Sequence, residues 1–327
     1  MHSKNRLHDY SKLPPMKKIT WILLLCSLCL TAQINKINTR EISIDQELKG
    51  TLYTPELEQK KPTLALLIPG SGPTNRSGNQ PGVHNNSLKY LAEGLAAKGI
   101  HVFGFDKRVI AQLIAGKVDE SKMDFEDNSK DVNLIVAYFK NLKTYSKIVL
   151  IGHSEGSLVG MMSATKNVDG FVSIAGPGRP IDEILYEQIA KQSPKNATET
   201  RTNLDLLKSG KTFDCTSESS IIKSIFRNSV QNYLISWIKI NPKIEIQKLK
   251  IPILLINGTK DLQVPESEAS LLQSFKPNAK LVIIENMNHV FKIIEGDESE
   301  NRASYNEPKI GIAPQLITSI FDFIIQL

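Results

Sequence analysis

Short, nearly continuous apolar runs that alternate with amphipathic stretches most strongly limit what this chain can fold into. An apolar run of this kind is typical of a strand that is buried on both faces of a sheet. Six such strands are predicted, at residues 62–70, 100–106, 147–152, 170–176, 251–258 and 280–285. Helical spacing predicts helices at residues 86–99, 124–143, 157–167, 267–275 and 312–327.

Alternation of strand and helix at this spacing predicts right-handed crossovers and a parallel sheet that helices cover on both faces. In front of it, residues 40–56 alternate between apolar and polar side chains, which is typical of a hairpin of two strands. We expect this hairpin to add antiparallel strands at one edge. The predicted fold class is therefore α/β, with a mostly parallel twisted sheet between two layers of helices.

One connection in this pattern is too long for a simple crossover. Residues 177–250 separate the fourth and fifth predicted parallel strands and span 74 residues, whereas connections in α/β units are usually much shorter. They contain helical patterns at residues 183–192 and 220–240. We interpret this segment as a helical cap that is inserted into a domain of residues 33–327.

The first 32 residues differ from the rest of the chain. Residues 1–15 are polar, and the basic start at Met16 is followed by an apolar run of 14 residues that ends at Ala32. A bilayer span needs about 20 apolar residues, so this pattern indicates a secretory signal peptide. We predict translation from Met16, cleavage after Ala32, and export to the periplasm or the extracellular space. An uncleaved anchor is the alternative.

Loss of this leader changes what charge and cysteine content imply. Of 40 basic and 34 acidic residues, five and one lie in the leader, so the remaining chain has a net charge of +2. A charge this small gives no reason to expect nucleic acid as a partner. Two of the three cysteines also lie in the leader, which leaves Cys215 alone and excludes an intrachain disulfide. A chain of this size buries enough apolar surface without one.

The sequence GHSEG, with Ser154 at its centre, lies between a predicted strand and a predicted helix. This is the setting of a nucleophile elbow, Gly-x-Ser-x-Gly, in which a strained turn lifts the serine hydroxyl above the sheet. Gly152 and Gly156 leave room for the turn. The N–H of Glu155 then lies at a helix N-terminus, where partial positive charge favours an anion.

A serine hydroxyl needs a base to become a nucleophile. Ligands of open α/β sheets bind beyond the carboxyl ends of the strands, and His289 follows the sixth predicted strand. His289 is therefore the predicted base, and His84, in a loop after the first parallel strand, is the second choice. The other histidines lie before the leader, inside the elbow or at the opposite strand end: His2, His8, His153 and His101.

Asp261 is the predicted carboxylate that orients the base, since it lies just beyond the fifth strand. The order Ser154, Asp261, His289 is that of hydrolases with a nucleophile elbow. Asp261 can instead be a residue that only stabilises its own turn. Asp182 and Glu266 are weaker candidates for the acid.

A glycine-rich loop, PGSGPTNRSGNQPG, follows the first parallel strand. Glycines let the backbone approach a ligand closely, and the developing oxyanion of acyl transfer needs two hydrogen-bond donors. We therefore predict an oxyanion hole that is made of the N–H groups of Ser71 and Glu155.

Five motifs together resemble the bacterial dienelactone-hydrolase-like esterases of the α/β-hydrolase superfamily, over most of residues 40–327: PGSGPTNR, FDKR, GHSEG, NGTKD and NMNH. The resemblance implies ester hydrolysis through an acyl-enzyme, without a metal or an organic cofactor. The chain departs from the family pattern at two places. Residues 109–111 are not the glycine-rich turn that often follows FDKR, and Asn75 stands where the family often has aspartate. Both departures affect the expected substrate range more than the triad.

Charged residues near the predicted site have two interpretations. Arg76 can pair with Asp106 and brace the loop, which is the favoured interpretation, or the pair can recognise a substrate anion. Glu155 can repel anionic substrates or can simply stabilise the positive end of its helix. In the cap, Phe226, Tyr233, Leu234 and Trp237 can line an acyl pocket. The helical spacing of Tyr233, Leu234 and Trp237 instead favours packing onto the core.

Together these features predict an exported serine hydrolase that cleaves small-molecule carboxylic esters. His289 takes the proton of Ser154, Asp261 holds the imidazole, and two backbone N–H groups bind the oxyanion. The alternatives are a serine aminopeptidase or an acyl-transferase with the same triad, and a binding protein of the same fold without catalysis.

Overall fold

A computed structural model describes residues 36–57, 59–164 and 167–327 of the chain. The predicted signal peptide, its cleavage after Ala32 and the start at Met16 lie outside these residues and stay predictions.

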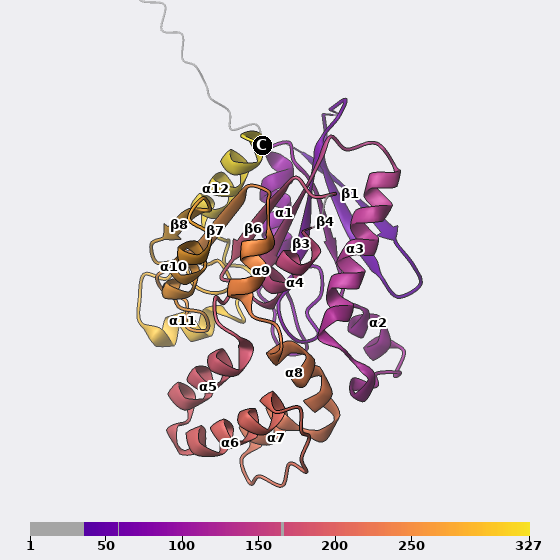
Figure 1. Ribbon diagram of the computed structural model, residues 1–327. Coiled ribbons are helices and arrows are strands. Elements are labelled where there is room, and N and C mark those ends of the chain that lie inside the picture. The colour runs from indigo at the N-terminus through magenta and orange to yellow at the C-terminus, as the bar shows by residue number, and fades with distance from the viewer. Residues whose placement is uncertain (1–35, 58, 165–166) are drawn as a thin grey trace, which may run out of the picture. The chain divides into compact units, whose positions relative to one another are not determined.

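In the described residues, eight strands form one sheet in the order β1-β2-β4-β3-β5-β6-β7-β8 (Figure 1). The strands are β1 (Ile37–Ser43), β2 (Lys49–Pro55), β3 (Thr63–Ile68), β4 (His101–Phe105), β5 (Lys147–His153), β6 (Gly170–Ile174), β7 (Ile253–Gly258) and β8 (Lys280–Ile284). From β4 to β8 all neighbours are parallel, whereas β1 and β2 pair antiparallel with each other and β2 pairs antiparallel with β4. The predicted sheet and its antiparallel edge hairpin are confirmed.

Helices cover both faces of this sheet (Figure 1). Outside the long insertion, the sequence pattern did not predict two of the helices, α2 and α11. The helices outside the long insertion are α1 (Ser87–Ala97), α2 (Arg108–Ile114), α3 (Phe125–Asn141), α4 (Glu155–Ser163), α10 (Glu266–Phe275), α11 (Glu298–Ser304) and α12 (Pro314–Ile325). A 3₁₀ turn, η1, spans Glu120–Lys122. None of the helices in the described residues has the length and apolarity needed to cross a membrane.

The alternation of side chains along each strand divides the core into two layers. On β3, Leu64 and Leu66 belong to the cluster that contains side chains of α3 and α4. Ala65 and Leu67 belong to the opposite cluster, which contains side chains of α1 and α12. Because strands buried on both faces need apolar residues at every position, the continuous apolar runs of the sequence form these strands.

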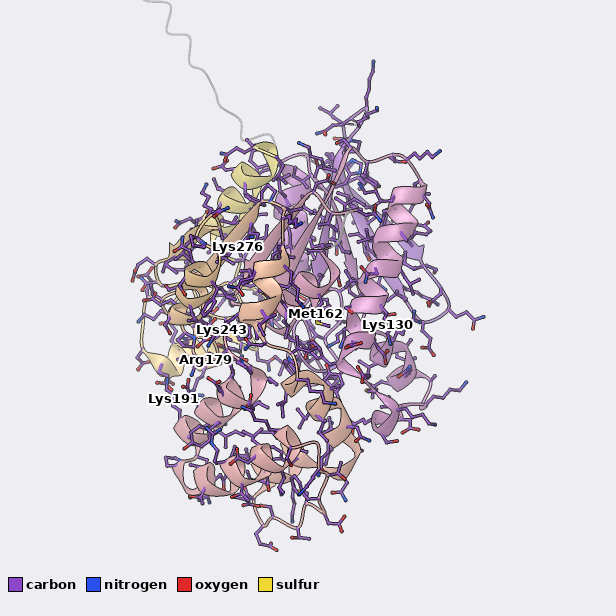
Figure 2. The ribbon with its side chains drawn as sticks, viewed as in Figure 1. Lys130, Met162, Arg179, Lys191, Lys243 and Lys276 are labelled. Atoms are coloured by element: carbon purple, nitrogen blue, oxygen red, sulfur yellow. The ribbon has the colours of Figure 1, made fainter. Side chains whose placement is uncertain are left out.

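The segment between β6 and β7 folds into five helices, four of which gather at one end of the sheet in Figure 1. They are α5 (Ile181–Gln192), α6 (Ala197–Lys208), α7 (Ser220–Phe226), α8 (Gln231–Ile238) and, nearer α4, α9 (Pro242–Lys248). Arg179, labelled in Figure 2, binds Glu187 of α5 and Glu268 of α10, and so ties the insertion to a helix that packs against β7 and β8. The division of the chain into a domain and a cap stays a prediction.

The helical pattern of residues 220–240 is two helices rather than one. The backbone is extended at Arg227, with ψ at 143°, and a 3₁₀ turn, η3 (Asn228–Val230), leads into α8. The amide Nε2 of Gln231 donates to the carbonyl oxygen of Phe226 at 2.8 Å. This side chain satisfies a carbonyl that a continuous helix would satisfy with its backbone, so a local side-chain hydrogen bond accompanies the break in the helical pattern.

Candidate active site

Ser154 lies in the sharp turn between β5 and α4, with φ at 55° and ψ at −122°. A residue other than glycine adopts this conformation only where the surrounding structure holds it there. A Cβ on Gly152 would lie 2.2 Å from the carbonyl oxygen of Gly156, and one on Gly156 would lie 2.3 Å from that of Ile68. Both glycines are therefore required by close backbone contact, and they allow the turn that presents the partly exposed Ser154.

Asp261 and His289, from the loops after β7 and β8, are in contact. Nδ1 of His289 lies 2.8 Å from Oδ2 of Asp261, and both side chains are almost fully buried. Oδ1 of Asp261 accepts hydrogen bonds from the N–H groups of Gln263 and Val264, at 2.8 and 2.9 Å. The carboxylate thus stabilises its own turn with one oxygen and faces the imidazole with the other, so the two interpretations of Asp261 are compatible.

His153, inside the elbow, holds the backbone of His289. Its Nε2 lies 2.9 Å from the carbonyl oxygen of His289, and the two rings are 4.8 Å apart between centroids. Burial, and then the neighbouring His289, lower the pKa of His153 well below its usual value, so the ring is neutral and its Nε2–H donates. Within the described residues, the hydroxyl of Ser154 makes no hydrogen bond to His289. In unliganded enzymes such contacts are often long and shorten when substrate binds.

The loop that carries His289 is organised by the buried side chain of Asn288. Its Oδ1 accepts from the N–H groups of Val290 and Lys292, at 3.1 and 3.0 Å. Its Nδ2 donates to Oδ1 of Asn301 and Oγ of Ser304, at 3.0 and 2.8 Å. Neutral amide and hydroxyl groups therefore attach the histidine loop to α11.

The loop after β3 lies directly against the nucleophile. A Cβ on Gly70 would lie 3.3 Å from Cβ of Ser154. The carbonyl oxygen of Ser71 accepts from Oγ1 of Thr74 and Nε2 of Gln80, at 2.7 and 2.9 Å. These contacts fix the loop beside the elbow, where the N–H of Ser71 is the predicted oxyanion donor.

Arg76 anchors the far end of this loop. It donates to Asp106 through its backbone N–H at 2.8 Å and through Nε and Nη2 at 3.1 and 2.7 Å. Its Nη1 also contacts Glu41 at 2.6 Å and Oγ1 of Thr51 at 2.8 Å. The predicted contact between Arg76 and Asp106 is confirmed. Both guanidinium donors converge on Oδ2 while the backbone N–H takes Oδ1, and a carboxylate that is bound to backbone and side chain alike favours a bracing role.

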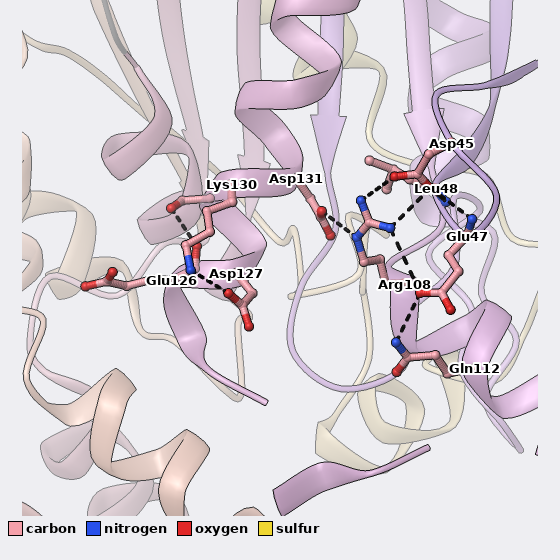
Figure 3. Close-up of polar contacts among 10 residues, drawn as sticks. Asp45, Glu47, Leu48, Arg108, Gln112, Glu126, Asp127, Lys130 and Asp131 are labelled. Atoms are coloured by element: carbon pink, nitrogen blue, oxygen red, sulfur yellow. Dashed lines mark hydrogen bonds and ion pairs between the residues drawn. The ribbon is translucent and has the colours of Figure 1, made fainter. Parts of the chain in front are cut away.

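Arg108 joins α3 to the turn between β1 and β2 (Figure 3). Its Nε contacts Asp131 of α3 at 2.6 Å, and its Nη2 contacts Asp45 of the β1–β2 turn at 2.5 Å. Arg108 also begins α2, so the residues that follow FDKR form a helix where the family often has a glycine-rich turn.

Lys107, between Asp106 and Arg108 in the sequence, contacts the turn that carries Ser154. Its Nζ lies 2.8 Å from Oε1 of Glu155, whose side chain is 1% exposed, and 3.3 Å from the carbonyl oxygen of Gly70. The hydroxyl of Tyr233 on α8 donates to Oε2 of Glu155 at 3.3 Å and accepts from Asn128 at 3.2 Å. Burial, and then the Glu155 charge, raise the pKa of Tyr233 well above its usual value, which keeps the phenol protonated.

A cavity of about 460 Å³ opens beside this group, lined by Gly72, Pro73, Lys107 and Tyr233 together with residues of α2, η1 and α3. Ser154 and His289 are not among its lining residues, so the cavity adjoins the loop after β3 rather than these two side chains. Its size is within the range of ligand pockets.

Three of the four aromatic and apolar insertion residues pack into the core. Phe226, Leu234 and Trp237 are buried, and Trp237 stacks on Phe125 with ring centroids 4.9 Å apart. Of these four residues, Tyr233 alone lines the cavity. The favoured packing interpretation is thus confirmed for Leu234 and Trp237. Tyr233 also packs against the core, and it faces both the cavity and Glu155.

The weaker candidates lie elsewhere. His84 is exposed, and its backbone N–H binds Asn306. His101 is at the amino end of β4, against the ring of Tyr145. Asp182 pairs with Lys208 inside the insertion at 2.7 Å, and Glu266 begins α10.

Tyr305 is a residue near the site that sequence reasoning missed. Its hydroxyl is buried, and burial, followed by the charge of Asp261, raises its pKa, so it stays protonated at neutral pH. It comes from the segment after α11, and no motif marks it. In the described residues, no group of three or more His, Cys, Asp or Glu side chains is placed to hold a metal ion.

Comparison with known proteins gave one curated relative and several solved structures. Esterase EstD from Thermotoga maritima is 27% identical over 264 residues, which are 79% of this chain and 61% of that protein. The chain therefore spans less than two thirds of the length of this relative. No family model matches the chain.

Two esterases of known structure share the fold at low identity. Est1E from Butyrivibrio proteoclasticus superposes with a TM-score of 0.56 and 16% identity, over 88% of this chain and 98% of that one. An esterase from Pyrococcus furiosus superposes with a TM-score of 0.54 and 16% identity, over 89% and 91% of the two chains.

Proposed function

We propose that this chain, which has the α/β-hydrolase fold, is a serine hydrolase that cleaves carboxylic esters through an acyl-enzyme. Its likeness to a curated esterase and to solved esterases supports this activity. The dienelactone-hydrolase-like branch stays a prediction.

The observation that carries the proposal is the contact between Asp261 and His289 beside the strained elbow of Ser154. Asp261 accepts from Nδ1–H of His289, which in the neutral imidazole leaves Nε2 without a proton and able to accept the proton of Ser154. Ser154 attacks the ester carbonyl carbon, and the carbonyl oxygen becomes an oxyanion.

The N–H groups of Ser71 and Glu155 are the proposed donors to this oxyanion. Glu155 is the first residue of α4, so its N–H has no partner within the helix. As the tetrahedral intermediate collapses, the imidazolium of His289 donates its proton to the departing alcohol. Water then attacks the acyl-enzyme with His289 as its base, and the acid leaves.

Hydrolysis of p-nitrophenyl esters of increasing chain length tests this function. Residues 33–327 are expected to turn over these esters, and Ser154→Ala is expected to lower kcat by about 10⁶-fold. Ser163→Ala, at the far end of α4, is the matched control and should keep wild-type activity. A fluorophosphonate probe should label the wild type and the control but not Ser154→Ala.

Two other outcomes would replace the proposal. A wild type that is inert on esters but cleaves aminoacyl anilides would be an aminopeptidase with the same triad. A wild type that is inert on both and takes no label would be a binding protein.

A further inference from the structure

The buried carboxylate of Glu155, directly after Ser154, is not explained by the proposed reaction, which uses only the backbone N–H of this residue. Glu155 is 2% exposed, and a buried charge is costly unless it is paired. Lys107 supplies the pairing charge, with Nζ 2.8 Å from Oε1. Since apolar residues often replace buried ion pairs without loss of stability, pairing alone does not account for these two residues.

The second contact of Lys107 is more informative. Its Nζ lies 3.3 Å from the carbonyl oxygen of Gly70. That oxygen belongs to the same planar peptide unit as the N–H of Ser71, and in a trans peptide the two bonds point in opposite directions. A hydrogen bond to the oxygen therefore sets the direction of the N–H, and the positive charge polarises it.

The Gly70–Ser71 peptide needs a contact from outside the loop to fix its orientation, because glycine precedes and follows Ser71. Gly70 and Gly72 permit backbone rotations that other residues restrict, and Gly72 has φ at 73°. The loop nonetheless lies against Ser154, where small displacements change the distance from a donor to the oxyanion.

We infer that Lys107 is a positioning residue of the oxyanion hole. Through Gly70 it orients the peptide that carries the Ser71 donor, and through the Glu155 carboxylate it holds the residue that carries the other donor. One side chain thereby aligns both N–H groups on a single point. The inference rests on the proposed ester hydrolysis.

The test compares Lys107→Met, Glu155→Gln and the double variant in ester hydrolysis, with Lys130→Met as the matched surface control. Lys107→Met is expected to lower kcat by about 10–100-fold, below the roughly 10²–10³-fold effect of deleting one donor. KM should change less than threefold. The inhibition constant of a trifluoromethyl ketone, whose adduct carries the oxyanion, should rise by the same factor as kcat falls.

The double variant separates positioning from support of a buried charge. It removes both charges, so its melting temperature should return towards that of the wild type. Its kcat should stay as low as that of Lys107→Met, because the contact to Gly70 is still missing. It also keeps the test decisive if Lys107→Met alone does not fold.

Two results would overturn the inference. One is a folded Lys107→Met or double variant with kcat within threefold of the wild type. The other is a fall in kcat without loss of affinity for the trifluoromethyl ketone. Failure of the proposed function itself is distinct, since the wild type would then be inert on esters before any variant is compared.

Discussion

The two sides of Ser154 are held in place by different kinds of interaction. On the oxyanion side, charged groups add to the neutral contacts of Thr74 and Gln80 in holding the loop after β3. Arg76 of this loop pairs with Asp106, and Lys107, which pairs with Glu155, donates to the Gly70 carbonyl. On the histidine side, the loop after β8 is held by neutral groups, chiefly the amide of Asn288 and the ring of His153.

The difference corresponds to the charge that each side must handle. A negative charge develops on the substrate oxygen, so a cation beside the donors favours the transition state. The imidazole instead cycles between neutral and protonated forms. Neutral contacts orient it without adding a further charge beside the pair that it makes with Asp261.

The largest expected effect on the histidine side comes from removing the charge of Asp261, which faces His289. Asp261→Asn can still accept from the backbone at its turn, but its amide faces Nδ1 of His289 and favours the wrong tautomer. We expect kcat for ester hydrolysis to fall by about 10⁴-fold. Asp182→Asn is the control and should retain activity; the reverse pattern would assign the acid to Asp182.

A smaller expected effect is a difference between the two sides in how salt changes the loss of unfolding free energy on mutation. Arg76→Gln should lower the free energy of unfolding by about 1–3 kcal/mol, and Asn288→Ala by about 2–4 kcal/mol. Raising salt from 0.1 to 1 M shortens the Debye length from about 10 to about 3 Å. The loss for Arg76→Gln should therefore shrink in 1 M salt, while that for Asn288→Ala should not.

Urea unfolding at the two salt concentrations measures these losses. Asn141→Ala, at an exposed position that ends α3, serves as the neutral control. Equal salt responses of Arg76→Gln and Asn288→Ala would remove the distinction between an ionic and a neutral side.

The last expected effect depends on pH and concerns Lys292, the one cation within the histidine loop, residues 285–297. Its Nζ donates to the carbonyl oxygens of Ser304 and Glu307, at 2.6 and 2.5 Å. Burial lowers its pKa to about 8. Because the unfolded chain binds this proton more tightly, the contribution of Lys292 to stability rises as pH increases from about 8 to about 10.5.

The comparison of wild type with Lys292→Met isolates this contribution. The difference in unfolding free energy should change in favour of the wild type above pH 8, by at most about 1.4 kcal/mol per pH unit. It should be flat below pH 7. A difference that does not vary up to pH 10.5 would show that Lys292 keeps an ordinary pKa.

Much of the architecture was predictable because it follows from local patterns. Continuous apolar runs predicted the parallel strands, and residues 40–56 predicted the edge hairpin, since burial on one or two faces leaves a direct trace in residue order. The break at Arg227 was missed because a side-chain amide, rather than a backbone group, satisfies the carbonyl there.

By itself, the sequence determined where a strained strand-to-helix turn had to lie and which carboxylate and imidazole follow the later strands. Glycine spacing and chain order carry that information, because turns and strand ends are local. Tertiary structure alone decided which groups support them. Lys107 meets the Gly70 carbonyl, and His153 meets the His289 carbonyl, across 37 and 136 residues of chain. Such contacts leave no periodic trace, since they depend on where the packed sheet brings distant loops together.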